Sequence, residues 1–318
     1  MDPRSRPYSK GYQEIGNGVW AYLQPDGGWG WSNAGLIVEG NEALLIDTLF
    51  DRALTAEMLA AMKEIVSPTC RITKVINTHA NGDHCYGNAL VAGAEIIASQ
   101  ATVEEMNELP PATLAALMKM TSDLGEAGKF LANIFSPFNF EGIELVAPTK
   151  TFNGYIQLDL GGRVVQLFEV GPAHTRGDSF VYLPDEAIVF TGDIVFNGGH
   201  PIAWTGPVSR WIAACDRILS LDHVDVVVPG HGPLTDLGAV ASLKAYFKYL
   251  SDEARLRFEE GMTPLEAARD IDMSSYVNWG EPERVVVNVS TLYREFGADV
   301  ASDPLTLFGY MAEFRRTG

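Results

Sequence analysis

The chain has 318 residues, and its 23 Lys and Arg against 41 Asp and Glu give a formal net charge of −18 at pH 7. Apolar residues make up 47% and charged residues 20%, an ordinary globular composition that excludes a fibrous or wholly disordered chain. The acidity argues against nucleic acid as a partner, because such binding depends on Lys and Arg at the phosphates. It also argues against docking on an anionic membrane surface.

Cysteine usage and the N-terminal segment indicate the cellular setting. The three cysteines, Cys70, Cys85 and Cys215, are widely spaced and odd in number, so no disulfide framework is predicted. Residues 1–10 are polar and lack the apolar stretch of a signal peptide, and no segment reaches the ~18 apolar residues of a membrane span. We therefore expect a soluble, cytoplasmic protein.

Strand and helix patterns alternate along the chain. Strands are predicted over 18–47 (with a turn at Gly40-Asn41), 74–78, 95–98, 149–171, 179–184, 187–192 and 224–229, and helices over 55–65, 207–220 and 237–272, while an apolar patch at 284–289 leads to a helical tail. Residues 101–146 are rich in Met and Phe, have helical periodicity over 112–135, and indicate an insertion. No composition shift marks a linker, so we expect one α/β domain over 1–318.

The six histidines are unevenly placed. Four of them, His79, His84, His174 and His231, lie near the ends of predicted strands beside Gly and Asp, in segments 78–84, 171–178 and 228–232, and a further strand ends at Asp193. Strands that end in this way would bring imidazole and carboxylate groups to one rim of a sheet. That mixture of ligands is what a divalent transition metal requires.

The remaining two histidines have weaker contexts. His223 lacks neighbouring turn glycines and is predicted to be a surface residue. His200 follows Asn197-Gly198-Gly199, just past Asp193, and could line a pocket or simply pack in its loop.

The histidine segments resemble those of the metallo-β-lactamase superfamily. That family's signature is His-x-His-x-Asp-His, then a Gly-x-x-His-Thr segment, a strand ending in Gly-Asp and a late Gly-His. The corresponding segments here are 79–84, 171–175, 192–193 and 230–231, in the same order. The resemblance covers about 15–235 and implies an αββα sandwich with its metal site at one edge. It leaves 101–146 as a helical insertion and 236–318 as a helical C-terminal extension.

The resemblance has one departure, in the family's first metal site. That site uses the two leading histidines of the signature and the histidine after Gly-Pro-Ala, and here these positions are His79, Asn81 and His174. An asparagine amide is a poorer ligand than imidazole for a borderline metal. The first site therefore lacks a ligand, and His79 and His174 are expected to hold a metal only weakly or not at all.

The second metal site is complete in the sequence. The resemblance assigns it to Asp83, His84 and His231, with Asp193 as the carboxylate that can bridge two metals. We expect one metal per chain bound by these four residues, with Zn²⁺ favoured and iron or manganese as alternatives. Metal-bound hydroxide would then be the nucleophile.

The residues freed from ligation could serve in catalysis. His79 and His174 could carry protons or donate hydrogen bonds to substrate, Asn81 could hold the substrate or the attacking water, and Asp193 could orient that water. Thr78, Thr175 and Asp178 could fix imidazole tautomers or be ordinary turn residues. Cys85 is interpreted as a packed residue and not a ligand.

Aromatic residues could cover such a site. Trp29 and Trp31 in a Gly-rich loop, together with Trp204 and insertion residues, could form an apolar pocket. These insertion residues are Met118, Met120, Phe130, Phe135 and Phe138, for which core packing is an equally good interpretation.

The expected function is hydrolysis of a small hydrophobic or aromatic substrate. The bond attacked could be an ester, lactone, thioester or amide, or the reaction could be a hydrolytic displacement such as dehalogenation. An iron-dependent oxygen-using enzyme and a non-catalytic binding protein remain open alternatives. Glutathione-thioester hydrolysis is disfavoured, because no Lys/Arg cluster lies near the motifs. The acidic charge and the helical extension are compatible with a homodimer.

Overall fold

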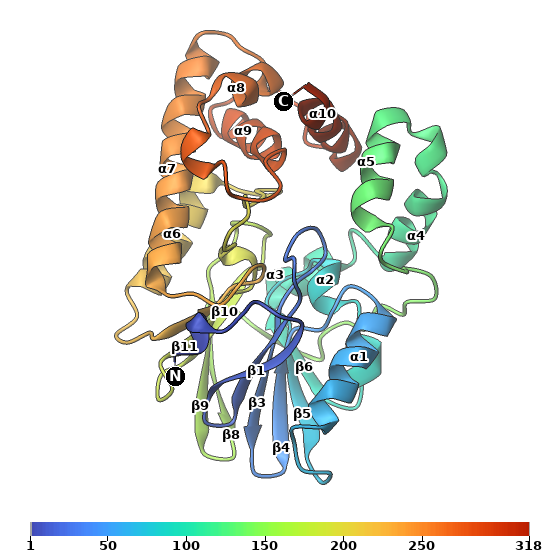
Figure 1. Cartoon of the computed structure of the whole chain (residues 1–318), viewed down its shortest axis with the longest axis vertical. Helices are drawn as coiled ribbons and strands as arrows, with labels where there is room; N and C mark the ends of the chain where they lie inside the picture. The colour runs from blue at the N-terminus through green and yellow to red at the C-terminus, as the bar shows by residue number, and fades with distance from the viewer. Residues whose placement is uncertain (1, 318) are drawn as a thin grey trace.

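The computed structural model describes residues 2–317 and arranges their strands in two sheets (Figure 1). The first sheet has the order β1-β2-β3-β4-β5-β6-β7 and the second β12-β11-β10-β9-β8. The strands are β1 Gly11–Gly16, β2 Val19–Leu23, β3 Ala34–Glu39, β4 Glu42–Ile46, β5 Arg71–Ile76, β6 Glu95–Ser99, β7 Lys150–Phe152, β8 Tyr155–Leu160, β9 Arg163–Glu169, β10 Ser179–Leu183, β11 Ile188–Phe190 and β12 Val226–Val228.

Both sheets are mixed. Strands β1 to β4 pair antiparallel, whereas β4 to β7 run parallel. In the second sheet β8 to β11 pair antiparallel and β12 runs parallel to β11. Parallel neighbours end at the same edge of their sheet, so the loops after β4, β5, β11 and β12 can bring side chains from distant parts of the chain together.

The helices account for most of the remaining chain. They are α1 Arg52–Lys63, α2 Gly82–Cys85, α3 Gln100–Met106, α4 Pro111–Lys119, α5 Gly125–Phe135, α6 Val208–Leu219, α7 Leu237–Glu259, α8 Pro264–Asp270, α9 Arg284–Glu295 and α10 Pro304–Thr317, with 3-10 turns at Pro3–Ser5, Asn88–Val91, Thr121–Asp123, Gly192–Ile194 and Ser274–Tyr276. Among the described residues, no helix combines the length and apolar character that crossing a bilayer would need.

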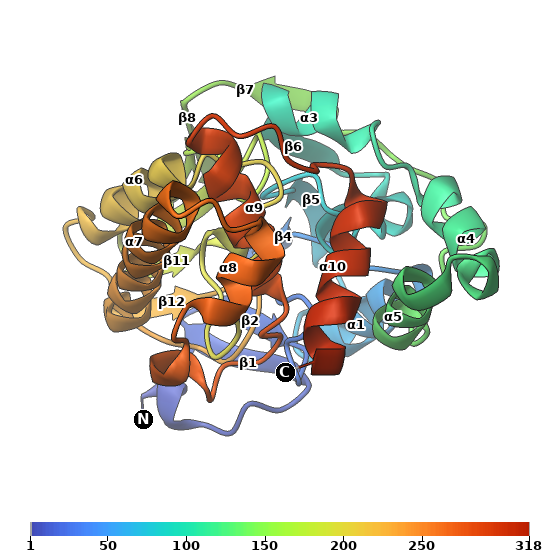
Figure 2. The same cartoon turned by 90° about the horizontal axis from the view of Figure 1, so that it is seen from above.

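The core is organised in layers. The inner faces of the two sheets pack through aliphatic side chains such as Leu44 and Leu167, both fully buried. On the outer face of the first sheet lies α1, which contributes Met58. Helices α6 and α7 cover the second sheet and bury Trp211 and Phe247. Figure 2 shows α1 and the α6–α7 pair on opposite sides of the strands. The predicted αββα sandwich is therefore confirmed.

The insertion and the C-terminal extension meet above one edge of the sandwich. Helix α10 lies beside α5 in both views (Figures 1 and 2). Phe308 of α10 contacts Phe130 and Phe135 of α5, with ring centroids 6.1 and 6.3 Å apart. Arg315 donates a hydrogen bond to Glu283, just before α9, at 2.9 Å. Segments that are distant in sequence thus form one helical cover.

Several elements differ from the sequence prediction. Strand β1 was not predicted, and α1 begins at Arg52, three residues earlier than expected. The early start follows from a cap, because the side chain of Asp51 accepts a hydrogen bond from the backbone N–H of Leu54. The apolar patch at 284–289 lies inside α9, where burial of its valines outweighs the weak helix propensity of β-branched residues.

Candidate metal centre

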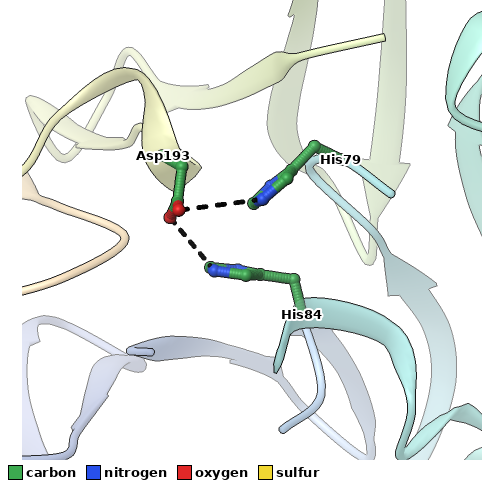
Figure 3. A group of neighbouring side chains, drawn as sticks. All are labelled: His79, His84 and Asp193. Atoms are coloured by element: carbon green, nitrogen blue, oxygen red, sulfur yellow. Dashed lines mark ion pairs between the residues drawn. The ribbon is translucent and has the colours of Figure 1, made fainter. Parts of the chain in front are cut away.

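The loops at one edge of the sandwich carry the predicted site residues. His79 follows β5, and the short helix α2 presents Asp83 and His84. Asp193 lies in the 3-10 turn after β11, and His231 follows β12. Figure 3 shows His79, His84 and Asp193 pointing toward one another from their separate elements.

A glycine makes this approach feasible. A Cβ atom at Gly230 would lie 2.0 Å from Oδ1 of Asp193, a distance that no real contact allows. The glycine before His231 therefore leaves the space that the Asp193 carboxylate occupies.

Four of the predicted histidine side chains converge on the Asp193 carboxylate. Its oxygens lie 3.0 Å from Nε2 of His84, 3.4 Å from Nε2 of both His174 and His231, and 3.8 Å from Nε2 of His79.

Asp83 completes the cluster. Its Oδ2 lies 3.3 Å from Nε2 of His231 and 3.9 Å from Nε2 of His84. Two groups could hold a metal ion, His79 with His84 and Asp193, and Asp83 with His84 and His231. His84 belongs to both groups.

Hydrogen bonds at Nδ1 set the tautomers of the histidines. His84 Nδ1 donates to Oδ2 of Asp47 at 2.8 Å, and His231 Nδ1 donates to the carbonyl of Gly27 at 3.1 Å. The Thr78 hydroxyl donates to Asp47, so its oxygen can accept from Nδ1 of His79 at 3.0 Å. With the proton at Nδ1, each of these Nε2 atoms keeps a lone pair directed at the cluster, the arrangement found in metal-ligating histidines.

His174 is arranged differently. Its Nδ1 donates to the carbonyl of Ile202 at 2.7 Å, so Nε2 is the acceptor atom of the ring. The Asn81 amide donates to that Nε2 at 2.9 Å. The asparagine therefore occupies the lone pair with which His174 would bind a metal.

Unpartnered atoms show that the cluster fits a metal ion. Nε2 of His79, Nε2 of His84 and Oδ1 of Asp193 are all buried and have no hydrogen-bond partner among the described residues. Leaving such atoms unpartnered is costly. A divalent cation held by His84 and Asp193 would satisfy two of these atoms and leave Nε2 of His79 free.

The electrostatic field divides the cluster into two halves. Burial lowers the pKa of each imidazole in the cluster. At His84 and His231 the carboxylates of Asp193 and its neighbours outweigh burial, and they raise the pKa of His84 well above its ordinary value and that of His231 to about 9. At His79 and His174 burial prevails, and the pKa of each falls below its ordinary value. The half that holds His84 and His231 is therefore the one that stabilises positive charge.

A cavity of about 410 Å³ opens onto the cluster. Its walls are mainly apolar, and its aromatic members are Trp29, Phe50, Tyr86, Phe135, Phe196, Trp204 and Phe308. The polar groups in the wall include Asn81, His174 and Arg284. The cavity is thus a mainly apolar, aromatic-rich pocket that opens onto the metal cluster.

The predicted pocket tryptophans and His200 differ in whether they line the cavity. Trp29 and Trp204 line the cavity, whereas Trp31 packs against Phe138 with ring centroids 4.8 Å apart. His200 is buried and its Nδ1 lies 3.2 Å from the Tyr246 hydroxyl, outside the cavity wall.

The aromatic and Met residues of the insertion occupy different surroundings. Phe135 lines the cavity, while Phe130 and Phe138 pack in the core and Met120 is exposed. His223 lies at the surface beside Asp225, and Cys85 is buried with its thiol donating to backbone carbonyls.

Two functional candidates were missed by sequence reasoning. Asp47 follows β4 with φ +62° and binds both Thr78 and His84. An aspartate directly after an apolar strand was the available signal. Arg284 comes from the C-terminal extension, and no motif marked it. Of the predicted tautomer-fixing residues, Thr78 contacts His79, whereas Thr175 and Asp178 bind each other.

These features define a class of protein. Two mixed sheets between helical layers, with His and Asp clusters at one edge beside an apolar cavity, are the architecture of a metal-binding αββα hydrolase. The sequence matches the family model of the metallo-β-lactamase superfamily over residues 27–231. The chain belongs to that superfamily, as its motifs predicted.

The relatives that match share only part of their length with this chain. The acyl-coenzyme A thioesterase MBLAC2 of Bos taurus is 28% identical over 114 residues, which is 34% of this chain and 39% of that protein. The 2,4-dinitroanisole O-demethylase subunit alpha of Nocardioides sp. (strain JS1661) is 33% identical over 89 residues, 26% of each chain. The chain therefore spans well under half of either relative.

One solved structure resembles this chain in fold over most of its length. The sec-alkylsulfatase Pisa1 from Pseudomonas sp. superposes with a TM-score of 0.69 at 17% identity, over 92% of this chain and 51% of that one. At this identity the likeness concerns the fold alone.

Proposed function

We propose that this protein is a metal-dependent hydrolase of a small aromatic or otherwise apolar substrate. One observation carries the proposal: an aromatic cavity of about 410 Å³ opens directly onto a buried His/Asp cluster with unpartnered ligand atoms. Such a cavity selects apolar substrates, and a divalent metal in such a cluster serves hydrolysis.

We propose Asp83, His84, Asp193 and His231 as the ligands of one metal ion per chain. The hydrogen bond from Asn81 to Nε2 of His174 supports this count, because it occupies a ligand atom of the first site. The mixture of two imidazoles and two carboxylates favours zinc and is also compatible with iron or manganese.

The chemistry divides between the metal and the chain. A bound zinc ion would supply acidity to a coordinated water and polarise the substrate group that gains negative charge. His79 presents a bare Nε2 lone pair 3.8 Å from Oδ2 of Asp193, so it can accept a proton from water at that atom. Asn81 and His174 line the cavity and can position the substrate. The aromatic walls exclude bulk water from the reacting bond.

The substrate class is also supported by the relatives. One acts on acyl-coenzyme A thioesters and another on a dinitrated aromatic ether, as their names state. Both reactions can proceed by hydrolytic attack at an electrophilic carbon. We accordingly propose an acyl carbon or an activated aryl carbon as the point of attack. Hydrolytic dehalogenation would be an attack on an activated aryl carbon.

Metal analysis combined with a substrate panel tests the proposal. Protein purified without added metal should contain one metal per chain and hydrolyse aryl esters, thioesters or halogenated nitroarenes, and chelation should abolish the activity until zinc is restored. His84→Ala and His231→Ala should lose metal and activity together. His223→Ala is the matched control, because that side chain is 68% exposed. Activity that survives complete metal removal would overturn the proposal, and iron content with dioxygen uptake would favour the oxygen-using alternative.

A further inference from the structure

Arg284 is a buried cation in the wall of the apolar cavity. The residue is only 2% exposed to solvent. It lies at the start of α9, in the C-terminal extension, and lines the cavity. Nη1 donates to the carbonyl of His200 at 2.9 Å, while Nε is buried and has no hydrogen-bond partner among the described residues. A guanidinium carries five N–H donors, so most of its capacity is unused.

The charge of Arg284 is weakly compensated. A carboxylate oxygen of Glu281 lies 4.0 Å from Nη1. The neighbouring Glu283 carboxylate instead accepts hydrogen bonds from Trp29 and Arg315. The Trp29 ring contributes a cation–π contact, with the guanidinium carbon 4.3 Å from the ring centroid. Because buried charges are normally paired with an opposite charge, the structure leaves room for an anion.

The position of Arg284 indicates how far a group bound to its guanidinium would lie from the metal cluster. The ring of His231 stacks on Phe196 with centroids 5.1 Å apart and planes 2° apart. The guanidinium carbon of Arg284 lies 5.4 Å from the centroid of the same Phe196 ring. One aromatic ring thus separates the guanidinium from a proposed metal ligand.

We propose that Arg284 binds a carboxylate of the substrate, about one aromatic ring away from the bond that is attacked. The planar fork of arginine matches a carboxylate in a bidentate geometry. The carboxylate would fix the substrate with its opposite end at the metal cluster, so that Arg284 determines both specificity and orientation. This inference rests on the proposed hydrolase function, because it names the substrate of that same cavity.

A matched pair of probes tests the proposal in the protein as purified. The ligand 4-ethylbenzoate carries the anion at neutral pH, and 4-ethylbenzamide is its neutral counterpart of nearly the same shape. Binding is measured by calorimetry and by the fluorescence of Trp29, which contacts the guanidinium. Wild-type protein should bind the benzoate about 10- to 100-fold more tightly than the benzamide, which is the usual range for a hydrogen bond to a charged group.

Variants identify the residue responsible. Arg284→Met should remove the preference for benzoate and leave the benzamide Kd within about twofold, and Arg284→Lys should retain part of the preference because it keeps the charge without the fork. Arg255→Met is the matched control, since Arg255 also lies over an aromatic ring, that of Phe296 at 3.5 Å, but outside the cavity wall. It should preserve the wild-type preference.

The outcomes separate this inference from the proposed function. Equal binding of the two probes by the wild-type protein would overturn the inference alone, since the apolar cavity would still bind its ligand. A benzoate preference that survives Arg284→Met but disappears on metal removal would place the carboxylate on the metal and also overturn it. If neither probe binds, the aromatic substrate class fails and the inference fails with it.

Discussion

Asp47→Asn is the most direct test of how the cluster prepares His84 for a metal. The Asp47 carboxylate is buried and accepts three hydrogen bonds, from the backbone N–H of Thr78 at 2.7 Å, from the Thr78 hydroxyl at 2.8 Å and from Nδ1 of His84 at 2.8 Å. Asparagine tolerates the positive φ of this position, so the backbone should be preserved. The substitution changes one oxygen into an amide donor.

The expected loss of metal affinity follows from the change in the tautomer of His84. The bond from Thr78 N–H can be kept by the remaining oxygen, but the new amide group faces the Nδ1–H of His84. To avoid two opposed donors, His84 must move its proton to Nε2, the atom that both candidate metal groups share. Loss of such a supporting partner lowers metal affinity by about 10- to 100-fold, or about 1.4 to 2.7 kcal/mol.

Competition with a chelator of known affinity measures this loss. Asp178→Asn serves as the control, because Asp178 is equally buried but its carboxylate accepts from Thr175, at 2.9 and 2.6 Å, and not from an imidazole. It should leave metal affinity unchanged. The reasoning would be refuted if Asp47→Asn bound metal as tightly as the wild-type protein, or if both variants weakened it equally.

Three further predictions concern the metal and the buried acids. Asn81→His frees Nε2 of His174 and restores the missing ligand, so the stoichiometry in metal analysis should rise from one toward two per chain; an unchanged ratio contradicts our account. Metal removal should lower the Tm in calorimetry, since a ligand at about 1,000 times its Kd stabilises by about 4 kcal/mol. Burial raises the pKa of Asp178 to about 8, above its unfolded value, so its contribution to stability is complete below pH 4 and is lost as the pH rises toward 8. In urea titrations at pH 5 and pH 8, Asp178→Asn should therefore lose less stability with rising pH than the wild-type protein, and parallel curves would exclude this role.

The first ligand segment could be found in the sequence because its residues are close together, whereas His174, Asp193 and His231 were found from the family's ordered motifs. His79, Asn81, Asp83 and His84 lie within six positions, and their spacing depends only on one strand end and one short helix. The alternation of strands and helices likewise follows from the period of apolar residues and predicts an α/β domain. The αββα layering was predicted from the family resemblance of the histidine segments. The boundary of α1 was missed because the cap at Asp51 acts before the apolar pattern begins.

Contacts between distant segments required the folded chain. Asn81 and His174 are 93 positions apart, and nothing in either segment shows that the amide would meet Nε2. Trp29 and Trp31 occupy the same loop with equal apolar character, yet only Trp29 faces the cavity. Between them Gly30 has φ +75°, and side-chain direction in such a turn depends on which neighbours fill the space. Arg284 joins the cavity because α9 packs against the sandwich, a placement set by burial of its apolar face and not by any pattern near the histidines.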